Sequence, residues 1–171
     1  MNFLKLANKK FLIFLLFIIY GCSEPEYYLF DGREGRLEDF NGKWLIINYW
    51  ADWCPPCIKE MPELSAFYES NKDEVLVLAF NFDELEGSDL KEQILRFKVE
   101  IPSLLTNPKE LYGLLDKNKI ITPHIKEFHT IFPKINKKIT NYEKIVKASK
   151  TCNCNIVLKG AETLICSPSG N

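Results

Sequence analysis

The chain has 171 residues and a formal net charge of −1, and 46% of its residues are hydrophobic. The near-neutral charge argues against nucleic acid as a partner, because binding a polyanion needs a clear excess of basic residues. Once an N-terminal leader is set aside, about 150 residues remain, which is enough for the core of one domain.

The first 21 residues are predicted to be an export signal. Lys5, Lys9 and Lys10 make the start of the chain positive, and an unbroken apolar run follows at 11–20. This run is too short to cross a bilayer as a helix, as expected of a signal peptide. The segment is therefore a targeting element and is left out of the fold.

The end of this leader, Ile19-Tyr20-Gly21-Cys22, resembles the lipobox of bacterial lipoproteins. In a lipobox a small residue precedes a cysteine that is lipidated and becomes the mature N-terminus, so the resemblance implies a lipid anchor at Cys22. The alternative is an uncleaved anchor or an ordinary signal peptide with a coincidental cysteine. Every one of these exports the domain, so a periplasm-facing location in the cell envelope is predicted. Ser23 favours the outer membrane over the inner one.

The first predicted core element is the apolar run Leu45–Trp50. Residues 22–43 before it are polar and rich in turn formers, which predicts a tether and a hairpin. The run is apolar on both faces, as in a central strand covered by helices on both sides. Residues 54 to about 70 then carry apolar side chains at helical spacing, which predicts a helix.

The sequence Trp53-Cys54-Pro55-Pro56-Cys57 joins this strand to this helix. The free N–H groups and the positive dipole end of a helix favour a thiolate at its first residue, and a lowered thiol pKa makes a cysteine nucleophilic near neutral pH. Cys57 follows one turn later, where it can close a disulfide with Cys54. This context predicts a redox-active dithiol.

Zinc binding is the alternative for the Cys-x-x-Cys motif. A structural zinc site would need two further soft ligands at metal spacing. The remaining candidates are Cys152, Cys154 and Cys166, which lie far along the chain. The predicted function therefore requires neither a metal nor an organic cofactor.

Strands and helices alternate through the middle of the chain. Val75–Phe80 is a second apolar strand, and the order strand–helix–strand implies a parallel pair with a right-handed crossover. Residues 90–99 are predicted as a helix, 101–105 as a short strand, and 108–115 as a further helix.

Toward the C-terminus the pattern weakens. Residues 125–132 are predicted as a strand of mediocre quality, and no glycine follows until Gly160. Residues 134–150 contain six lysines and one glutamate, which predicts a solvated helix face, with an anionic membrane surface as the minor alternative. One residue separates Cys152 from Cys154, a spacing predicted to be too short for an unstrained bridge.

The segment 48–64, centred on the two cysteines, resembles the active-site segment of the thioredoxin superfamily. It looks most like the TlpA/ResA-like thiol–disulfide oxidoreductases of bacterial envelopes, and the resemblance extends over roughly residues 28–123. It implies a thioredoxin-like α/β fold with a central mixed β-sheet flanked by helices on both faces. The part from about residue 125 onward does not match this pattern.

The resemblance also assigns roles to single residues. Cys54 matches the attacking cysteine, Cys57 the resolving one, and Trp53 the ring that flanks the site. Glu60 matches an acid that some ResA-like proteins use to tune thiol protonation, and an exposed helix glutamate is its alternative reading. Asn48 stands where cytoplasmic thioredoxins carry a buried aspartate that assists proton transfer, so Glu60 or water is left to move the proton.

The family further places a cis-proline opposite the dithiol. Pro123, in Ile121-Thr122-Pro123-His124, is predicted for this position from its distance along the chain, with Pro102 as the rival. Cis bonds are rare outside X–Pro, and this one would expose backbone for pairing with a substrate.

These observations predict four segments. They are a lipoprotein signal peptide at 1–21, a tether and hairpin at 22–43, a thioredoxin-like domain at 44–133, and a divergent Lys-rich, Cys-containing tail at 134–171. Whether the tail completes the sheet or reflects a change of reading frame is left open.

The predicted function is an envelope-anchored thiol–disulfide oxidoreductase that reduces protein disulfides through Cys54 and Cys57. Its role would be cell redox homeostasis or cytochrome maturation. Its partners would be protein disulfides, a membrane electron donor that re-reduces it, and the membrane itself through the lipid anchor. The alternatives are a non-catalytic dithiol binding module and an antioxidant redoxin of the thiol peroxidase type. The thiol peroxidase would need a Thr and an Arg arranged around a lone cysteine, and the sequence near Cys54 shows no such arrangement.

Overall fold

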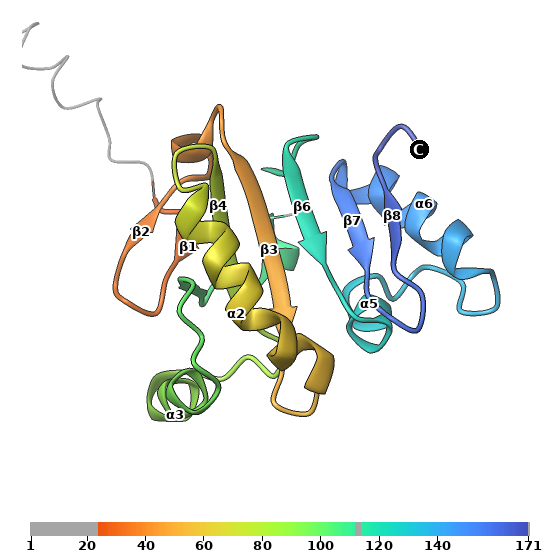
Figure 1. Ribbon diagram of the computed structural model, residues 1–171. Helices are drawn as coiled ribbons and strands as arrows, with labels where there is room; N and C mark the ends of the chain where they lie inside the picture. Colours follow the sequence, from red (N-terminus) through yellow and green to blue (C-terminus); the bar gives the residue numbers. More distant parts are fainter. Residues whose placement is uncertain (1–23, 112–113, 171) are drawn as a thin grey trace, which may run out of the picture.

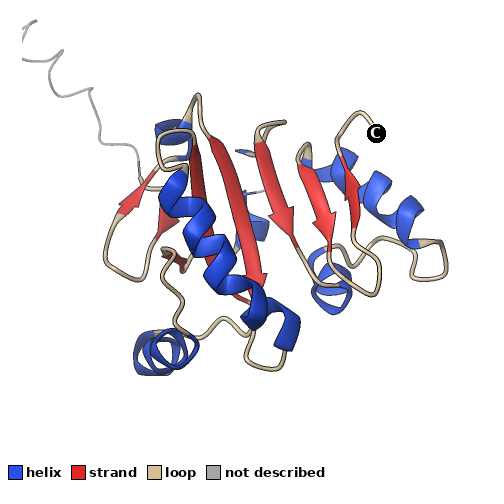
Figure 2. Ribbon diagram, viewed as in Figure 1, coloured by secondary structure: helices blue, strands red, loops and turns tan. Residues whose placement is uncertain are grey.

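A six-stranded sheet with helices on both faces forms the centre of the computed structural model, which describes residues 24–111 and 114–170 (Figures 1 and 2). The strand order is β5-β4-β3-β6-β7-β8. The fold class is therefore α/β with a central mixed sheet, as predicted. Within the described ranges, no helix has the length and apolarity needed to cross a bilayer.

The middle of the sheet is built from the two most apolar runs of the sequence. Strand β3 (Trp44–Trp50) pairs in parallel with β4 (Val75–Asn81) along its whole length, from Trp44 opposite Val75 to Trp50 opposite Asn81. The short strand β5 (Ser103–Leu104) pairs in parallel with β4 at the edge. The two long strands and their parallel pairing confirm the strand–helix–strand prediction.

The described chain begins with a small two-stranded ladder beside this sheet. Strands β1 (Tyr27–Tyr28) and β2 (Glu34–Gly35) pair antiparallel, and a 3₁₀ helix, η1 (Leu37–Phe40), leads into β3. Gly32 in the turn between β1 and β2 has a φ of 86°, a conformation that glycine adopts without a Cβ clash. The predicted leader and Cys22 lie outside the described residues.

The C-terminal part of the chain extends the sheet on the other side of β3. Strand β6 (Lys119–Thr122) pairs in parallel with β3, β7 (Asn155–Leu158) pairs in parallel with β6, and β8 (Leu164–Cys166) pairs antiparallel with β7. Helix α6 (Asn141–Cys152) precedes β7. Residues beyond 134 thus add strands β7 and β8 to the same sheet and pack helix α6 against it.

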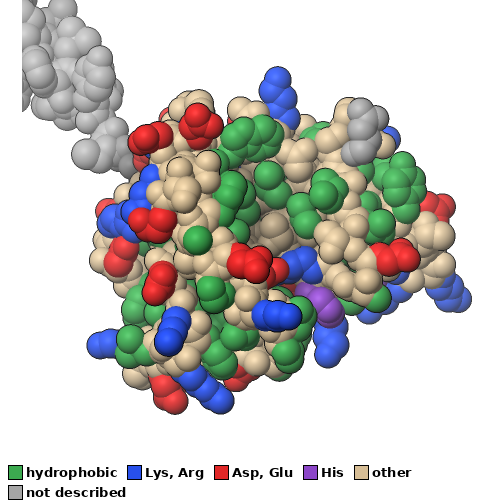
Figure 3. All heavy atoms as spheres, in the orientation of Figure 1, with side chains coloured by type: hydrophobic (Ala, Val, Ile, Leu, Met, Phe, Trp, Pro, Cys, Tyr) green, Lys and Arg blue, Asp and Glu red, His purple; other side chains and the backbone are tan. Residues whose placement is uncertain are grey.

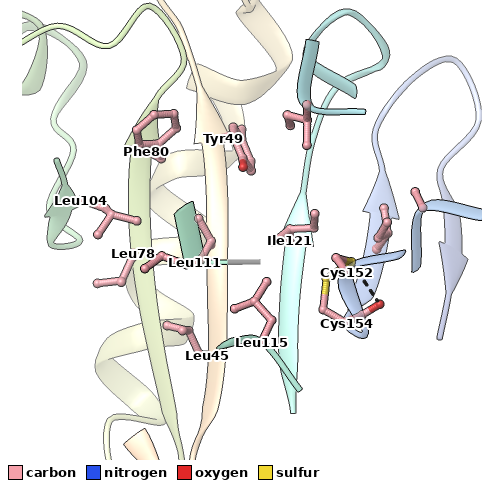
Figure 4. Packing of buried hydrophobic residues seen from close by; sticks show 14 of the residues in the cluster. Leu45, Tyr49, Leu78, Phe80, Leu104, Leu111, Leu115, Ile121, Cys152 and Cys154 are labelled. Atoms are coloured by element: carbon pink, nitrogen blue, oxygen red, sulfur yellow. Dashed lines mark hydrogen bonds between the residues drawn. A yellow bond between two sulfur atoms is a disulfide. The ribbon is translucent and has the colours of Figure 1, made fainter. Parts of the chain in front are cut away.

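Helices cover the two faces of the sheet because β3 and β4 are apolar on both faces. Alternate residues of a strand point to opposite faces, and Ile47 and Tyr49 join one buried cluster while Trp50 joins the other. Helices α2 (Pro55–Ser70) and α3 (Gly87–Phe97) pack on the Trp50 side. Helix α4 (Pro108–Leu111) and α6 pack on the Tyr49 side, where Figure 4 shows the close packing of the cluster.

The predicted strand at 125–132 is wrong, because these residues form helix α5 (Ile125–Ile131). The helix begins with a reciprocal cap in which the His124 backbone N–H donates to Glu127 Oε2 at 2.7 Å. Phe128 and Ile131 then fall one turn apart on the buried side of the helix. Helical spacing of the large side chains and this cap outweigh the β-branched content of the segment.

The cysteine pair at the end of α6 also differs from the prediction. Cys152 and Cys154 form a disulfide with their Cα atoms 5.3 Å apart, which lies within the normal range for a bridge (Figure 4). Asn153 between them has a φ of 51°, so the chain reverses there and brings the two cysteines together. Cys166 is buried and not in a disulfide.

Candidate active site

The two cysteines of the Trp53-Cys54-Pro55-Pro56-Cys57 segment lie at the carboxyl end of β3, where α2 begins. Cys54 is the N-terminal cap of α2 and Pro55 its first helical residue. Cys54 and Cys57 are joined in a disulfide with their Cα atoms 5.3 Å apart. Both are buried, with exposed fractions of 3% and 1%. The strand end and the helix start thus bring together the pair that the sequence singled out.

The two prolines shape the first turn of α2. Proline has its φ set for the first helical position, and its missing N–H removes no bond there. Since Pro55 and Pro56 carry no N–H, Cys57 is the first residue of the helix that can offer a backbone donor. The hydrogen bonds of helix α2 start with the Ile58 N–H, which donates to the Cys54 carbonyl at 3.1 Å. The dipole of α2 therefore points its positive end at Cys54.

Charged and aromatic side chains from four strand ends converge on this edge of the sheet. Trp53 follows β3, Asp83 follows β4, Glu127 follows β6 in the first turn of α5, and Lys159 follows β7. Because these four strands are parallel, their carboxyl ends meet at one edge, where ligands and reactive groups gather in α/β folds.

The Trp53 ring is held in place beside Cys54 and is 40% exposed. Its Nε1–H donates to both carboxylate oxygens of Asp83, at 3.1 and 3.0 Å. Phe82 meets the ring edge-on with centroids 5.9 Å apart, and Lys126 Nζ lies 5.4 Å from the ring centroid. The contact with Lys126 joins α5 to the segment that carries the dithiol.

Glu60 lies on α2 in an ion pair. Its Oε1 atom is 2.6 Å from Lys159 Nζ, and the same ammonium donates to Asn48 Oδ1 and to the Tyr49 carbonyl, each at 3.1 Å. Asn48 also accepts a hydrogen bond from Thr122 Oγ1. Glu60 and Asn48 thus share one cation from the C-terminal part of the chain.

This ion pair borders a surface hollow between α2 and β7. The hollow is visible on the face shown in Figure 3 and is lined by residues that include Asn48, Glu60, Glu63, Leu64, Thr122 and Lys159. Neither cysteine of the dithiol is among its lining residues. The opening therefore leads to the Glu60–Lys159 pair and leaves the sulfurs covered.

Sequence reasoning missed Glu127, a buried carboxylate beside the dithiol. One of its carboxylate oxygens and the Sγ atoms of Cys54 and Cys57 all lie within 4.8 Å of one another. The Glu127 side chain is fully buried, and its Oε1 has no hydrogen-bond partner among the described residues. The available signal was the spacing from His124 to Glu127, which matches a helix cap and which the predicted strand obscured.

Burial raises the pKa of Glu127 to about 7. The hydrogen bond from the His124 backbone and the positive charge of Lys159 oppose this rise, while the charges of Glu60 and Asp83 add to it. Near neutral pH the carboxyl therefore populates both its protonated and its ionised form.

Cys54, Cys57 and Glu127 bring three potential metal ligands together, but in the disulfide form the two sulfurs are not available to a metal. The sulfurs are bonded to each other, so they offer no thiolate, and metal binding to cysteine needs one. Cys152, Cys154 and Cys166 belong to the buried cluster on the other face of the sheet. Among the described residues, no third cysteine reaches the dithiol.

The peptide bond before Pro123 is trans, because the described residues contain no cis peptide bond. This differs from the prediction of a cis-proline at Pro123. The Pro123 carbonyl accepts from Lys159 N–H at 2.8 Å, and Ile125 N–H donates to the Lys159 carbonyl at 3.2 Å. Parallel pairing of β6 with β7 thus continues past Thr122, and an extended trans chain suits it.

Comparison with known proteins places this chain in a family. The family model of the AhpC/TSA family matches residues 24–128, which is more than half of the chain. The chain belongs to the AhpC/TSA family. Among the relatives of this AhpC/TSA family member, the thiol-disulfide oxidoreductase ResA of Geobacillus thermodenitrificans is 34% identical over 120 residues, covering 60% of this chain and 68% of the relative. The thioredoxin-like protein YneN of Bacillus subtilis is 35% identical over 71 residues, covering 40% and 42%.

A solved structure is similar as well. The solution structure of a thiol:disulfide interchange protein from a Bacteroides species has 26% identity and a TM-score of 0.43, covering 53% of this chain and 60% of that one. The ResA relatives confirm the predicted membership of the thioredoxin superfamily in its TlpA/ResA-like branch. This AhpC/TSA family member is thus a thioredoxin-like thiol–disulfide oxidoreductase.

A second family model, that of NAD(P)H-hydrate dehydratase, matches residues 104–171. The two matches overlap over residues 104–128, which include β6 and the first part of α5. Glu127 lies in this overlap, whereas Lys159 lies in the second match alone. The C-terminal part of this AhpC/TSA family member therefore resembles another family in sequence while it pairs into the same sheet.

Proposed function

We propose that the chain reduces protein disulfides as an envelope-anchored enzyme, with Cys54 as nucleophile and Cys57 as resolving residue. The observation that carries this proposal is the Cys54–Cys57 disulfide at the junction of β3 and α2. Cys54 is the residue at the positive end of the helix dipole, where a thiolate is favoured. The thiol-disulfide oxidoreductase relatives support the same chemistry.

The reaction transfers two electrons from the dithiol to the substrate. The Cys54 thiolate attacks one sulfur of the substrate disulfide, so the substrate S–S bond breaks and a mixed disulfide forms. Cys57 then attacks Cys54 Sγ, which releases the second substrate thiol and leaves the Cys54–Cys57 bridge. Two protons pass from the enzyme dithiol to the reduced substrate, and a membrane electron donor must reduce the bridge for the next cycle.

A substrate reaches Cys54 only when the cover over the dithiol opens. Cys54 is 3% exposed, and a carboxylate oxygen of Glu127 on α5 lies within 4.8 Å of both sulfurs. The Lys126–Trp53 contact joins α5 to the same place at the protein surface. The docking of a protein substrate would therefore separate Lys126 from the Trp53 ring, since a cation–π pair on a partly exposed ring is weak.

We propose that the chain has four segments, namely a leader at 1–21, a tether and hairpin at 22–43, a thioredoxin-like domain at 44–133 and a C-terminal segment at 134–171. Residues 134–171 supply α6, β7 and β8, which protect the flank of β6 and carry Lys159 to the Glu60 side chain. Their role in this proposal is to complete the sheet next to the site.

Attachment to the membrane is proposed to occur through lipid on Cys22. Replacing Cys22 with alanine is expected to release the exported protein into the soluble envelope fraction, because a multiply acylated cysteine is what would hold it on the membrane. Fractionation of cells that make the full chain, followed by immunoblotting of both fractions, measures this. Ser23→Ala serves as the matched control and should stay bound. A Cys22→Ala protein that remains in the membrane fraction would count against the lipid anchor.

A redox titration of the Cys54–Cys57 pair tests the function itself. The full chain is equilibrated with mixtures of reduced and oxidised glutathione or dithiothreitol, and the fraction of free dithiol is measured by thiol labelling. A reversible two-electron transition at a strongly negative potential supports a reductase, whereas a potential near those of strong oxidants indicates a disulfide donor. Stoichiometric capture of a disulfide client without turnover would indicate a dithiol binding module.

Replacing Cys57 with alanine is expected to trap mixed disulfides. Cys54 can still attack a substrate, but no second thiol is present to release the product, so the adduct persists. Non-reducing electrophoresis of cell extracts should show adducts that disappear on addition of dithiothreitol. The Cys54→Ala/Cys57→Ala double variant is the control and should show none. A clean gel for the single variant would contradict the assigned roles of the two cysteines.

A further inference from the structure

The dithiol needs a proton acceptor that the residues assigned from the family do not provide. Asn48 has an amide side chain, which does not exchange a proton near neutral pH, and its oxygen already accepts from Thr122 and Lys159. Glu60 holds Lys159 in an ion pair at 2.6 Å. A resolving thiol must lose its proton before it can attack, so a proton acceptor close to Cys57 would speed this step.

We propose that Glu127 is this group: it accepts the proton of the Cys57 thiol as Cys57 attacks the mixed disulfide, and it passes that proton to the departing substrate thiolate. This rests on the proposed function. The S–S bond between Cys54 and the substrate breaks, the Cys54–Cys57 bond forms, and one proton moves from Cys57 through Glu127 to the product. The carboxylate is regenerated at the end of the step, and the substrate disulfide is the oxidant.

The position of Glu127 fits this task. Its carboxylate lies within 4.8 Å of the Sγ atoms of Cys54 and Cys57, a separation that one water molecule or a small rotation spans. Oε2 is tied to the His124 backbone N–H at 2.7 Å, which fixes the orientation of the group. Oε1 is buried without a hydrogen-bond partner among the described residues, so one lone-pair site is open for a proton.

The charges around Glu127 determine when it can accept a proton. Lys159 after β7 and the His124 N–H favour the carboxylate, whereas burial and the charges of Glu60 on α2 and Asp83 after β4 favour the acid, with a resulting pKa of about 7. Below that pH the group is protonated and cannot accept, and above it the carboxylate can. The resolution step in the intact protein should therefore accelerate as the pH rises through about 7.

A stopped-flow experiment with 5,5′-dithiobis(2-nitrobenzoate), a small aromatic disulfide, separates the two steps. The reduced full chain releases one nitrothiobenzoate when Cys54 attacks and a second when Cys57 resolves the adduct. The other cysteines also release nitrothiobenzoate, and this contribution is corrected for by subtracting the trace of the Cys54→Ala/Cys57→Ala variant. The second phase is first-order and independent of the reagent concentration, so its rate is read directly at each pH between 5 and 9.

In Glu127→Gln the second phase is expected to slow at least tenfold at pH 8 and to lose its inflection near pH 7, while the first phase stays within about twofold of the parent. Glu63→Gln, which removes an exposed carboxylate from α2, should match the parent in both phases. An unchanged second phase in Glu127→Gln, or loss of the inflection in Glu60→Gln instead, overturns the assignment. Absence of both phases in the parent protein would refute the proposed function and not the Glu127 assignment alone.

Discussion

Replacing Cys54 with alanine is expected to lower the rate of disulfide reduction by about a thousandfold or more, without loss of the fold. Cys54 is the cysteine at the start of α2, and Cys57, one turn further into the helix, is 1% exposed and lacks the helix-end position. Without the proposed nucleophile no mixed disulfide is expected to form, so no later step can compensate. The rate is measured by the reduction of insulin disulfides with dithiothreitol as the electron source.

The matched control for this variant is the double substitution Cys152→Ala/Cys154→Ala, which removes the other disulfide of the structure. That pair lies in the cluster on the opposite face of the sheet, so insulin reduction should stay within about twofold of the parent once the variant is shown to be folded. Circular dichroism and urea unfolding establish the fold of each variant. Activity retained in Cys54→Ala but lost in the double variant would shift the chemistry to the C-terminal cysteines.

Glu127→Gln is expected to stabilise the protein at pH 8 by about 3 kcal/mol, with no effect at pH 4. The pKa of Glu127 is raised from 4.5 in the unfolded chain to about 7 in the folded one, so the folded state binds the extra proton between these values. The free energy of unfolding therefore falls as the pH rises from about 4.5 to about 7, and the loss is complete above that range. A glutamine keeps the His124 hydrogen bond and carries no charge, so it avoids this loss.

Urea unfolding of the oxidised full chain and of Glu127→Gln at pH 4, 6 and 8 measures the difference. The gap between the two curves should open between pH 4 and pH 8, while the Glu63→Gln control follows the parent at each pH. A Glu127→Gln protein that is equally stable or less stable at pH 8 would mean that the buried carboxylate is stabilised by a partner. In that case its pKa would not be raised, and the assignment of Glu127 as proton acceptor would lose its physical basis.

The sequence predicted the parts of the site that depend on local pattern. Two apolar runs flanked by turn formers indicated β3 and β4, and the Cys-x-x-Cys motif between strand and helix indicated the dithiol, which the structure joins as a disulfide. The local pattern predicted the wrong element after residue 125. Helix α5 is only about two turns long, so its apolar spacing could not be told from that of a short strand. The peptide bond before Pro123 is trans, and the residues around Pro123 pair with Lys159, which lies far away in the sequence.

The sequence by itself therefore determined the fold class, the central strands and the two sulfurs proposed to react, because each follows from residues that are neighbours along the chain. Only the tertiary structure decided what surrounds those sulfurs. Lys159 reaches Glu60, and Glu127 reaches the dithiol, because parallel pairing of β3, β6 and β7 brings their carboxyl ends to one edge. The raised pKa of Glu127 has the same origin, since the low-dielectric environment that opposes its charge is created by packing and not by sequence neighbours.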